Sequence, residues 1–442
     1  MHVLATSEVT LPGETLGTRD DRLTSSTFWG DTPLPLAISN QKLNIINYQL
    51  LINAVLQYLK YLIPFVAPQV RNWTWEARLL NWLTCIWLLV GLITLISASY
   101  SEGIIEHQDG FYILKRQLIG IIVGIIAFNI VTNQPLKNTL KISPVMVIFL
   151  LFLIFMTAVP GIGKTVYGAR RWIALGPFSI QPSELIKPFL VMQAAYLFAR
   201  WKNLLWNIRG TWLAIFSLTL AGILIQPNLS TTALCGMSLW LIAVAAELPW
   251  NQLLSVSLGG LTVAGLSLWR NPYQWDRIVF FLEPWDDPQG KGYQLIQSLI
   301  AIASGGWSGS GLGLSQQKLS YLPIRSTDFI FSVYSEEFGF IGCLLLLIFI
   351  LSYGTIALRV AFKSNNKIQR LVAIGVMVFL VGQSLINIGV ATGSLPTTGL
   401  PFPFFSYGIN SIVASLLLAG LLIRVARESS KGKVIQLKID HG

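Results

Sequence analysis

The sequence predicts an all-α integral membrane protein with ten transmembrane helices and a large extracytoplasmic loop between spans 7 and 8. Hydrophobic residues make up 53% of the 442 residues and charged residues only 12%, which is typical of a polytopic membrane protein rather than a soluble domain. Ten apolar runs also follow one another, each near the ~20 residues that a helix needs to cross a bilayer. They lie near residues 79–99, 113–132, 142–160, 184–200, 211–226, 231–247, 252–269, 329–358, 371–392 and 405–424.

Two segments precede the spans. Residues 1–40 are polar, mixed in charge and rich in Thr, Ser, Gly and Pro. This composition predicts a disordered cytoplasmic leader, and a signal peptide is not expected. Residues 41–74 are apolar but interrupted by Asn, Gln and Lys, so an interfacial helix and linker fit better than a span. The ten-span domain is therefore expected over residues 75–428, followed by a basic cytoplasmic tail over 429–442.

The distribution of Lys and Arg between the loops predicts the orientation. The loops after the second, fourth and eighth runs and the C-terminal tail are basic, whereas the loops after the first, fifth and ninth runs carry no Lys or Arg. Both termini are therefore predicted to be cytoplasmic, and loop 270–328 to face outward. This asymmetry accounts for the net charge of +11, so nucleic-acid binding is not expected. Basic residues on the outer side need another reason, such as binding an anion. They are Lys115, Arg116, Lys164, Arg170, Arg171, Arg270, Arg277, Lys291, Lys318 and Arg325.

Cysteine and histidine offer little chemistry in this chain. The three Cys lie in apolar runs without a Cys-x-x-Cys spacing, so we expect buried small side chains rather than disulfides or metal ligands. The three His lie at both termini and in one short loop. Acid–base chemistry is therefore expected to fall to carboxylates.

Asp328 lies where the long polar loop becomes apolar sequence. On a helix, Glu336 would share its face and lie ~12 Å deeper, where a carboxylate usually faces a cavity or a partner. Alone, Asp328 could be a helix N-terminal carboxylate favoured by the helix dipole. Nearby Lys318 and Arg325, with the polar face below, instead predict a site at the membrane boundary. The residues of that face are Ser332, Ser335, Glu336 and Gly339.

Glu184 and Lys187 are three residues apart, so they share a helix face near the outer end of the fourth span. Pro188 cannot donate to the carbonyl of Glu184, which predicts a kink at this pair. The pair either marks a site or steadies a kinked helix, and intramembrane charges favour a site. Just before it, Arg170 and Arg171 fit lipid headgroup anchors and phosphate ligands equally well.

Six short motifs occur in order along the chain. They are Gly168-Ala-Arg-Arg-Trp-Ile, Gln181-Pro-Ser-Glu-Leu-Ile-Lys, Pro284-Trp-Asp-Asp-Pro, Thr327-Asp-Phe-Ile-Phe, Glu336-Glu-Phe-Gly and Ser406-Tyr-Gly. Together they resemble the FtsW/RodA/SpoVE (SEDS) family over roughly residues 75–428, and its division branch more than its elongation branch. Three positions depart from the family pattern. Ser326 replaces a usual His, Asn228 a frequent Asp, and Ile409 a usual Gly.

The resemblance implies ten spans and a peptidoglycan glycosyltransferase of the bacterial plasma membrane. Such an enzyme polymerises lipid II into glycan strands, here during septal wall synthesis in cell division. The implied partners are a class B penicillin-binding transpeptidase and other divisome membrane proteins. The family's essential outer-face aspartate corresponds to Asp328, and its Glu and Lys to Glu184 and Lys187.

In the mechanism that this implies, Asp328 is the general base for the acceptor hydroxyl, and the polymer grows with inversion. Glu184 and Glu336 are assigned to substrate binding. A divalent cation, Mg or Mn, is left open, and no other cofactor is expected. Cations must stabilise the diphosphate leaving group. The candidates are Arg170, Arg171, Lys187, Lys318 and Arg325.

Two other function classes remain open. A lipid II flippase would also use intramembrane charges, but the charged candidates gather at the outer half of the predicted spans. A non-catalytic scaffold that recruits the transpeptidase explains the spans but not the polar face below Asp328.

Overall fold

The computed structural model describes most of the chain that follows the predicted leader and interfacial helix. Those two segments lie outside the described residues, apart from 70, 73 and 74. The described residues are 70, 73–166, 169–176, 178–319, 322–323 and 325–439. Residues 57–442 form one compact unit, and the description below concerns that unit.

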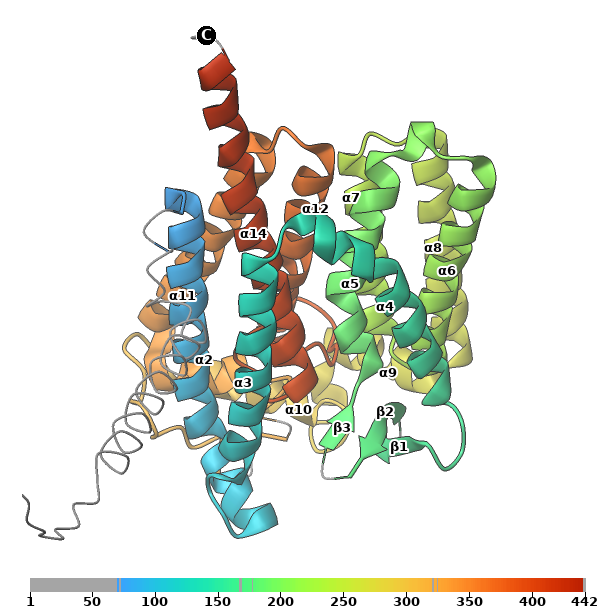
Figure 1. Ribbon diagram of the computed structural model, residues 1–442. Helices are drawn as coiled ribbons and strands as arrows, with labels where there is room; N and C mark the ends of the chain where they lie inside the picture. The colour runs from blue at the N-terminus through green and yellow to red at the C-terminus, as the bar shows by residue number, and fades with distance from the viewer. Residues whose placement is uncertain are drawn as a thin grey trace, which may run out of the picture. The chain divides into compact units, whose positions relative to one another are not determined.

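Each of the ten predicted apolar runs is helical (Figure 1). Among the described helices, eight are long and apolar enough to cross a membrane, and α5 and α7 are not among the eight. The protein is therefore a multi-pass helical membrane protein, while a count of ten spans stays a prediction. The helices are α2 (Trp75–His107), α3 (Tyr112–Asn133), α4 (Leu136–Met156), α5 (Pro182–Ala199), α6 (Trp206–Ile225), α7 (Leu229–Ala245), α8 (Trp250–Arg270), α11 (Ile330–Lys363), α12 (Lys367–Met377), the π-helix η4 (Val378–Gly382), α13 (Gln383–Ala391) and α14 (Ile409–Ile439).

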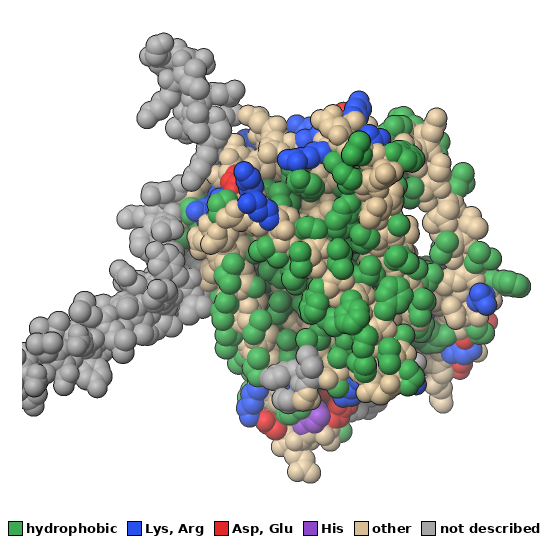
Figure 2. Space-filling view, turned by 45° about the vertical axis from the view of Figure 1, so that its right-hand side comes forward, with side chains coloured by type: hydrophobic (Ala, Val, Ile, Leu, Met, Phe, Trp, Pro, Cys, Tyr) green, Lys and Arg blue, Asp and Glu red, His purple; other side chains and the backbone are tan. Residues whose placement is uncertain are grey.

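The surface is divided as a bilayer requires. Figure 2 shows apolar side chains across the middle of the face in view, with Lys, Arg, Asp and Glu gathered toward its two ends. The share of buried residues differs between helices and separates those in the core from those at the surface. In the apolar part of α14, 83% of residues are buried, against 11% in α8. Thus α14 lies in the core of the bundle, and α8 exposes most of its surface to the lipid that a membrane would provide.

Close packing of α14 on α3 depends on small residues. An added Cβ at Gly124 of α3 would lie 2.5 Å from Cδ1 of Leu416, and one at Gly120 2.9 Å from Cγ2 of Ile412. Glycine at both positions therefore lets the two helix backbones approach, as is common between helices in membranes.

Loop 161–183 forms a small sheet, which the all-α prediction missed. Strands β1 (Gly163–Val166), β2 (Ala169–Leu175) and β3 (Phe178–Ile180) pair antiparallel in that order. Short strands joined by tight turns carry too little periodic signal to be read in a Gly-rich loop. The sheet lies at the end of the bundle opposite to the C-terminal end of α14 (Figure 1).

The long loop before α11 also contains structure. It forms helix α9 (Pro272–Leu282), the 3-10 turn η3 (Pro284–Asp286) and helix α10 (Tyr293–Ser304). Ser298 of α10 hydrogen-bonds to Ser332 of α11 at 2.6 Å. In Figure 1, α9 and α10 lie at the same end of the bundle as the sheet, and the bond to Ser332 places α10 beside the start of α11.

A glycine-rich stretch, residues 305–313, covers a break in α11. Gly339 interrupts the helix with φ 64°, and an added Cβ there would lie 2.3 Å from the backbone N of Gly309. The break leaves carbonyls and amides of α11 without hydrogen-bond partners inside the helix, and backbone groups of the glycine-rich stretch take the place of those partners. Backbone N–H groups of Ser310 and Gly311 donate to the carbonyls of Glu336 and Glu337, at 2.9 and 3.1 Å.

Candidate active site

Asp328 lies immediately before α11 but does not cap it. Phe329 occupies the N-cap position, and no side chain makes a capping hydrogen bond there. The structure therefore does not support the helix-cap interpretation of Asp328. Its backbone carbonyl accepts a hydrogen bond from Nδ2 of Asn387, at 2.8 Å, which holds the residue against α13.

The Asp328 side chain faces a small pocket of about 50 Å³. Helices α9, α10 and α13 and the connection between α13 and α14 supply its other walls. The lining residues are Tyr273, Arg277, Gln294, Asp328, Phe329, Val390, Thr397, Thr398, Gly399 and Leu400. A cavity of this size holds only small groups such as water molecules.

The pocket changes the acidity of Asp328. The side chain keeps some contact with the pocket surface but is surrounded by protein, and burial raises its pKa to about 6. The positive charges of Arg277 and Arg171 act in the opposite direction, and the negative charge of Glu184 adds to the increase. A carboxyl group with a pKa near 6 is suited to general-base catalysis near neutral pH.

Arg277 of α9 belongs to this site and was not among the predicted site residues. Its guanidinium donates to the carbonyl of Thr397 at 3.3 Å and to the hydroxyl of Tyr273 at 2.6 Å, and lies 4.7 Å from the centre of the Tyr273 ring. It thus joins α9 to the 397–400 wall. The available signal in the sequence was that Arg277 is a basic residue in a loop predicted to face outward, where the orientation rule expects few basic residues.

Glu184 and Lys187 form the predicted pair, on the first two turns of α5. Nζ of Lys187 donates to both carboxylate oxygens of Glu184, at 2.7 and 2.8 Å, and to Oε1 of Gln383 at 3.1 Å. The two residues are 3% and 1% exposed. All three ammonium protons of Lys187 are therefore engaged within the protein.

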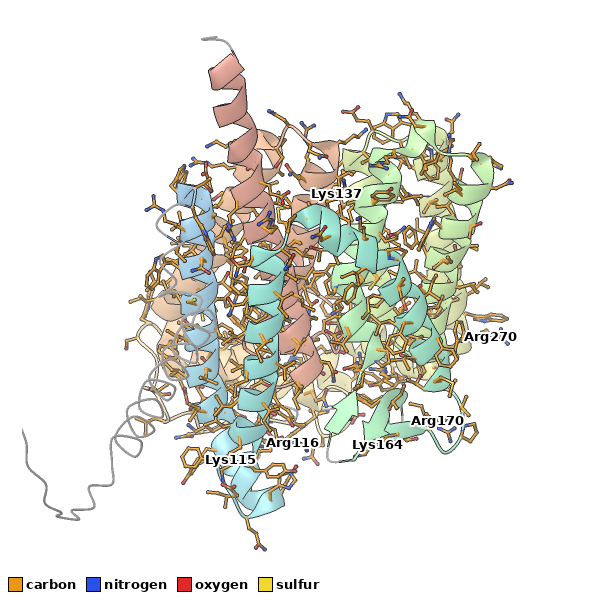
Figure 3. The ribbon with its side chains drawn as sticks, in the orientation of Figure 1. Lys115, Arg116, Lys137, Lys164, Arg170 and Arg270 are labelled. Carbon is orange, nitrogen blue, oxygen red and sulfur yellow. The ribbon has the colours of Figure 1, made fainter. Side chains whose placement is uncertain are left out.

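The two arginines of β2 lie differently. Arg171 is half-buried and donates to the carbonyls of Gln226 and Pro227, at 3.0 and 2.7 Å, so it holds the turn between α6 and α7. Arg170 is exposed. Figure 3 places it at the same end as other basic residues of the loops predicted to face outward, and Lys137 at the opposite end. The labelled residues at the shared end are Lys115, Arg116, Lys164 and Arg170, and Arg270 lies higher at the right-hand edge.

Glu336 and Lys318 do not line the Asp328 pocket. The Glu336 carboxylate accepts hydrogen bonds from the hydroxyl of Ser315 and from the backbone N–H of Gln316 at 2.8 Å. Nζ of Lys318 donates to Oε1 of Glu337 at 3.0 Å and to Ser97 at 2.9 Å. Both predicted site residues therefore have buried partners in the protein. The polar face predicted to run below Asp328 does not open into the pocket, because the glycine-rich stretch and the residues after it fold over this part of α11.

Arg325 is also buried, and its Nε lies 3.9 Å from Oε2 of Glu102 on α2. The neighbouring Ser326 hydrogen-bonds to Glu102 through its side chain, and its carbonyl accepts from the backbone N–H of Tyr407 at 2.8 Å. This cluster fixes the backbone just before Asp328, and Arg325 does not line the Asp328 pocket.

A metal ion in the pocket would have one protein carboxylate, that of Asp328, as a ligand. Among the described residues, no group of three or more His, Cys, Asp or Glu side chains is placed to hold a metal ion. Asp328 is the acidic residue of the pocket lining. Mg²⁺ commonly binds one or two protein carboxylates together with substrate phosphates, so a cation at Asp328 would depend on oxygens of a bound substrate.

Comparison with known proteins decides the family. A family model described as cell cycle protein, and covering FtsW, RodA and SpoVE, matches residues 77–431. The chain belongs to the FtsW/RodA/SpoVE family. The match takes in all of the pocket described above.

The match between this chain and its relatives in the FtsW/RodA/SpoVE family spans nearly the whole length of each relative. A probable peptidoglycan glycosyltransferase FtsW of Synechocystis is 53% identical over 86% of this chain and 96% of its own. Stage V sporulation protein E of Bacillus subtilis is 38% identical over 78% of this chain and 96% of its own. A solved structure described as a peptidoglycan synthase complex, which coordinates polymerization and crosslinking, has a TM-score of 0.64 at 27% identity, over 81% of this chain and 98% of the matched chain.

One departure from the FtsW/RodA/SpoVE pattern has a clear structural role. Asn228 is the N-cap of α7, and its Oδ1 accepts from the backbone N–H of Thr231 at 3.3 Å. Asn and Asp cap helices comparably. The absence of an acid at this position therefore leaves the local fold unchanged.

Proposed function

We propose that this chain is a peptidoglycan glycosyltransferase that polymerises lipid II into glycan strands during septal wall synthesis. The observation that carries the proposal is Asp328 in its pocket, beside Arg277 and with a pKa raised to about 6. Membership of the family and the names of the FtsW relatives support the same activity. The carboxylate is assigned the role of general base.

The proposed reaction joins two lipid-linked sugars. The acceptor hydroxyl loses its proton to Asp328 as its oxygen bonds to the anomeric carbon of the donor. The bond from that carbon to the diphosphate oxygen breaks on the opposite face, so the configuration inverts and the lipid diphosphate leaves. A sugar hydroxyl is a weak acid, so the base accepts the proton mainly as the new bond forms.

Cations near Asp328 stabilise the leaving diphosphate in this proposal. Arg277 and Arg171 are assigned first to this role, because both act electrostatically on Asp328. Arg170, which is exposed on β2, is assigned second. Arginine matches phosphate geometry well. Lys187 and Lys318 are engaged by buried carboxylates, so we assign them to holding the site rather than the leaving group.

A divalent cation would add charge stabilisation at the same place. Asp328 would hold it together with the diphosphate oxygens. The proton transfer and leaving-group contacts above are assigned to protein side chains.

Location and partners follow from the proposed reaction. Lipid II presents its sugars outside the plasma membrane, so the Asp328 end of the bundle faces outward and both termini are cytoplasmic. The Lys and Arg distribution supports this orientation. A class B penicillin-binding transpeptidase is the proposed partner, together with other divisome membrane proteins. The likeness to a synthase complex that coordinates polymerization and crosslinking supports that partner.

The test is strand formation by the purified chain. Labelled lipid II is supplied with and without a cognate transpeptidase, and glycan strands are separated by size. Asp328→Asn keeps size and most hydrogen bonding but removes the base, so we expect a loss of at least ~10²-fold. Normal expression and transpeptidase binding by this variant would exclude misfolding.

Two other outcomes identify the alternatives. Translocation of lipid II across liposomes without strand formation would indicate a flippase. Binding of the transpeptidase with neither activity would indicate a scaffold. Strand formation at the parent rate by Asp328→Asn would contradict the assignment of the base.

A further inference from the structure

Side chains hold three backbone carbonyls at residues 397–401, a segment that comprises the 397–400 pocket wall and the residue that follows it. Arg277 donates to the carbonyl of Thr397, at 3.3 Å. From α13, Asn387 donates to Leu400 at 2.9 Å and Gln383 to Pro401 at 2.5 Å. Residues 396–402 have no regular secondary structure, so these carbonyls depend on side chains for partners.

Gln383 and Asn387 form one polar face of α13. They are four residues apart, so they lie one above the other on the helix, and they are 3% and 2% exposed. The π-helix η4 ends immediately before Gln383. Such turns shift the faces of a helix and often occur at functional sites. Here the shifted face presents two amides to the 397–401 segment.

Each amide also reaches a residue of the proposed reaction site. Asn387 donates to the backbone carbonyl of Asp328 as well as to that of Leu400, at 2.8 Å. One side chain thus sets the distance between the base and the opposite pocket wall. Oε1 of Gln383 accepts from Lys187, while its amide nitrogen donates to Pro401. Gln383 therefore joins the Glu184–Lys187 pair to the same wall.

We infer that Gln383 and Asn387 are positioning residues, and that the Glu184–Lys187 pair acts on the pocket through Gln383. The three ammonium protons of Lys187 go to Glu184 and Gln383, so in this arrangement the pair has no proton for a substrate oxygen. Its ammonium instead fixes the Gln383 oxygen, which turns the amide nitrogen toward Pro401. The inference rests on the proposed function in so far as the wall is that of a lipid II polymerase.

A mutant cycle distinguishes this role from direct binding. The variants are Gln383→Leu, the uncharged pair Glu184→Gln with Lys187→Met, and all three together, each assayed for strand formation against lipid II concentration. Since small misplacements of reacting groups cost up to ~10²-fold in rate, we expect Gln383→Leu to lower kcat at least ~10-fold with KM nearly unchanged. The triple variant should be no slower than the pair variant. The pair change and Gln383→Leu both break the connection from Lys187 through Gln383 to Pro401, so the second change has nothing further to remove. The inference would be overturned if the losses of kcat in Gln383→Leu and in the pair variant multiplied in the triple variant, or if Gln383→Leu raised KM and left kcat unchanged.

The matched control is Gln193→Leu. Gln193 lies on α5, is also 3% exposed, and accepts a hydrogen bond from Ser143 of α4 at 2.9 Å, away from the pocket. The two substitutions remove the same group at the same burial. Equal losses of kcat in both variants would show a general effect of burying leucine. Gln383→Glu is a second variant if leucine prevents folding, because it keeps the oxygen that faces Lys187 and loses the donor to Pro401.

A labelling experiment needs no activity. Thr398→Cys places a thiol on the wall, and its rate of reaction with a small water-soluble thiol reagent is compared in the parent, Gln383→Leu and Asn387→Ala backgrounds. The chain without this substitution gives the contribution of its three native cysteines. We expect the two variants to react several-fold faster, because the wall is released, and equal rates would contradict the positioning role. A parent that makes no strands would refute the proposed function, while the labelling rates would still decide the inference.

Discussion

Nζ of Lys187 lies 2.7 and 2.8 Å from the two carboxylate oxygens of Glu184, inside the bundle. An ion pair this deeply buried contributes little net stability, because desolvation of both charges offsets their attraction. Removing one partner is different, since it leaves the other charge unpaired in the membrane-embedded core. The pair therefore makes the protein sensitive to single substitutions on the first turns of α5.

Single changes in this pair should cost more stability than the double change. We expect Lys187→Met or Glu184→Leu alone to destabilise the fold by about 3–5 kcal/mol, the range for breaking a buried pair. Glu184→Gln with Lys187→Met should cost less, since no charge stays buried. Thermal unfolding in detergent provides the measurement. Lys115→Met is the control, because the Lys115–Asp109 pair is exposed and exposed pairs contribute at most about 1 kcal/mol. A double variant less stable than both single ones would contradict this prediction.

Strand formation should depend on pH through Asp328. Burial and Glu184 raise the pKa of this carboxyl to about 6, against the opposing effect of Arg277 and Arg171. Asp328 must be ionised to accept a proton, so kcat should rise as pH increases through about 6 and level off above pH 7. Below the pKa, the rate should fall about tenfold per pH unit. Initial rates in buffers from pH 5 to 8 test this, and a flat profile would argue against Asp328 as the base.

Arg277→Gln should change both the rate and its pH dependence. Loss of the positive charge near Asp328 removes an effect that lowers the pKa of the carboxyl, so the acidic limb should move to higher pH. The rate at its maximum should also fall, since the leaving diphosphate loses a cation. Lys291→Gln provides a control with the same charge change in the same loop, where Lys291 pairs with Asp276 at 2.7 Å. If both variants gave the parent profile, Arg277 would have no electrostatic role at the site.

Gly339→Ala should destabilise the first turns of α11. The residue has φ 64°, and the new Cβ would lie 2.3 Å from the backbone N of Gly309, so the glycine-rich stretch must move away. We expect faster proteolysis within residues 305–313 and a lower thermal midpoint. Gly265→Ala on α8 is the control, because nothing lies within 4 Å of its added Cβ and alanine favours helix by about 1 kcal/mol. Equal behaviour of the two variants would show that the break in α11 is not held by the glycine-rich stretch.

The predicted orientation can be tested at Gln289, which is exposed in the loop between α9 and α10. Gln289→Cys should react with a membrane-impermeant thiol reagent in intact cells that have no outer-membrane barrier. Labelling of the chain without this substitution corrects for the native cysteines. Reaction only after lysis would reverse the proposed orientation, and with it the location of the Asp328 pocket.

Local patterns in the sequence were sufficient for the helices and for the residues of the buried pair. Long apolar runs predicted the helices that the structure contains, because a backbone within a bilayer must satisfy its hydrogen bonds internally. The i, i+3 spacing of Glu184 and Lys187 predicted their contact, since three residues bring side chains to one face of a helix. Asp328 was found in the same way, from the change of hydropathy at its position.

The sequence by itself thus determined the membrane class and the helices, and it singled out the carboxylate of Asp328 just before α11. Tertiary structure decided which charges meet that carboxylate. Arg277 reaches the pocket because α9 lies against the 397–400 wall. Thr397, whose carbonyl Arg277 contacts, is 120 residues further along the chain. Glu336 is turned away because residues 315–317 fold over α11 and take its carboxylate. Such pairings depend on chain segments that are distant in sequence, and hydropathy or periodicity within one helix carries no information about them.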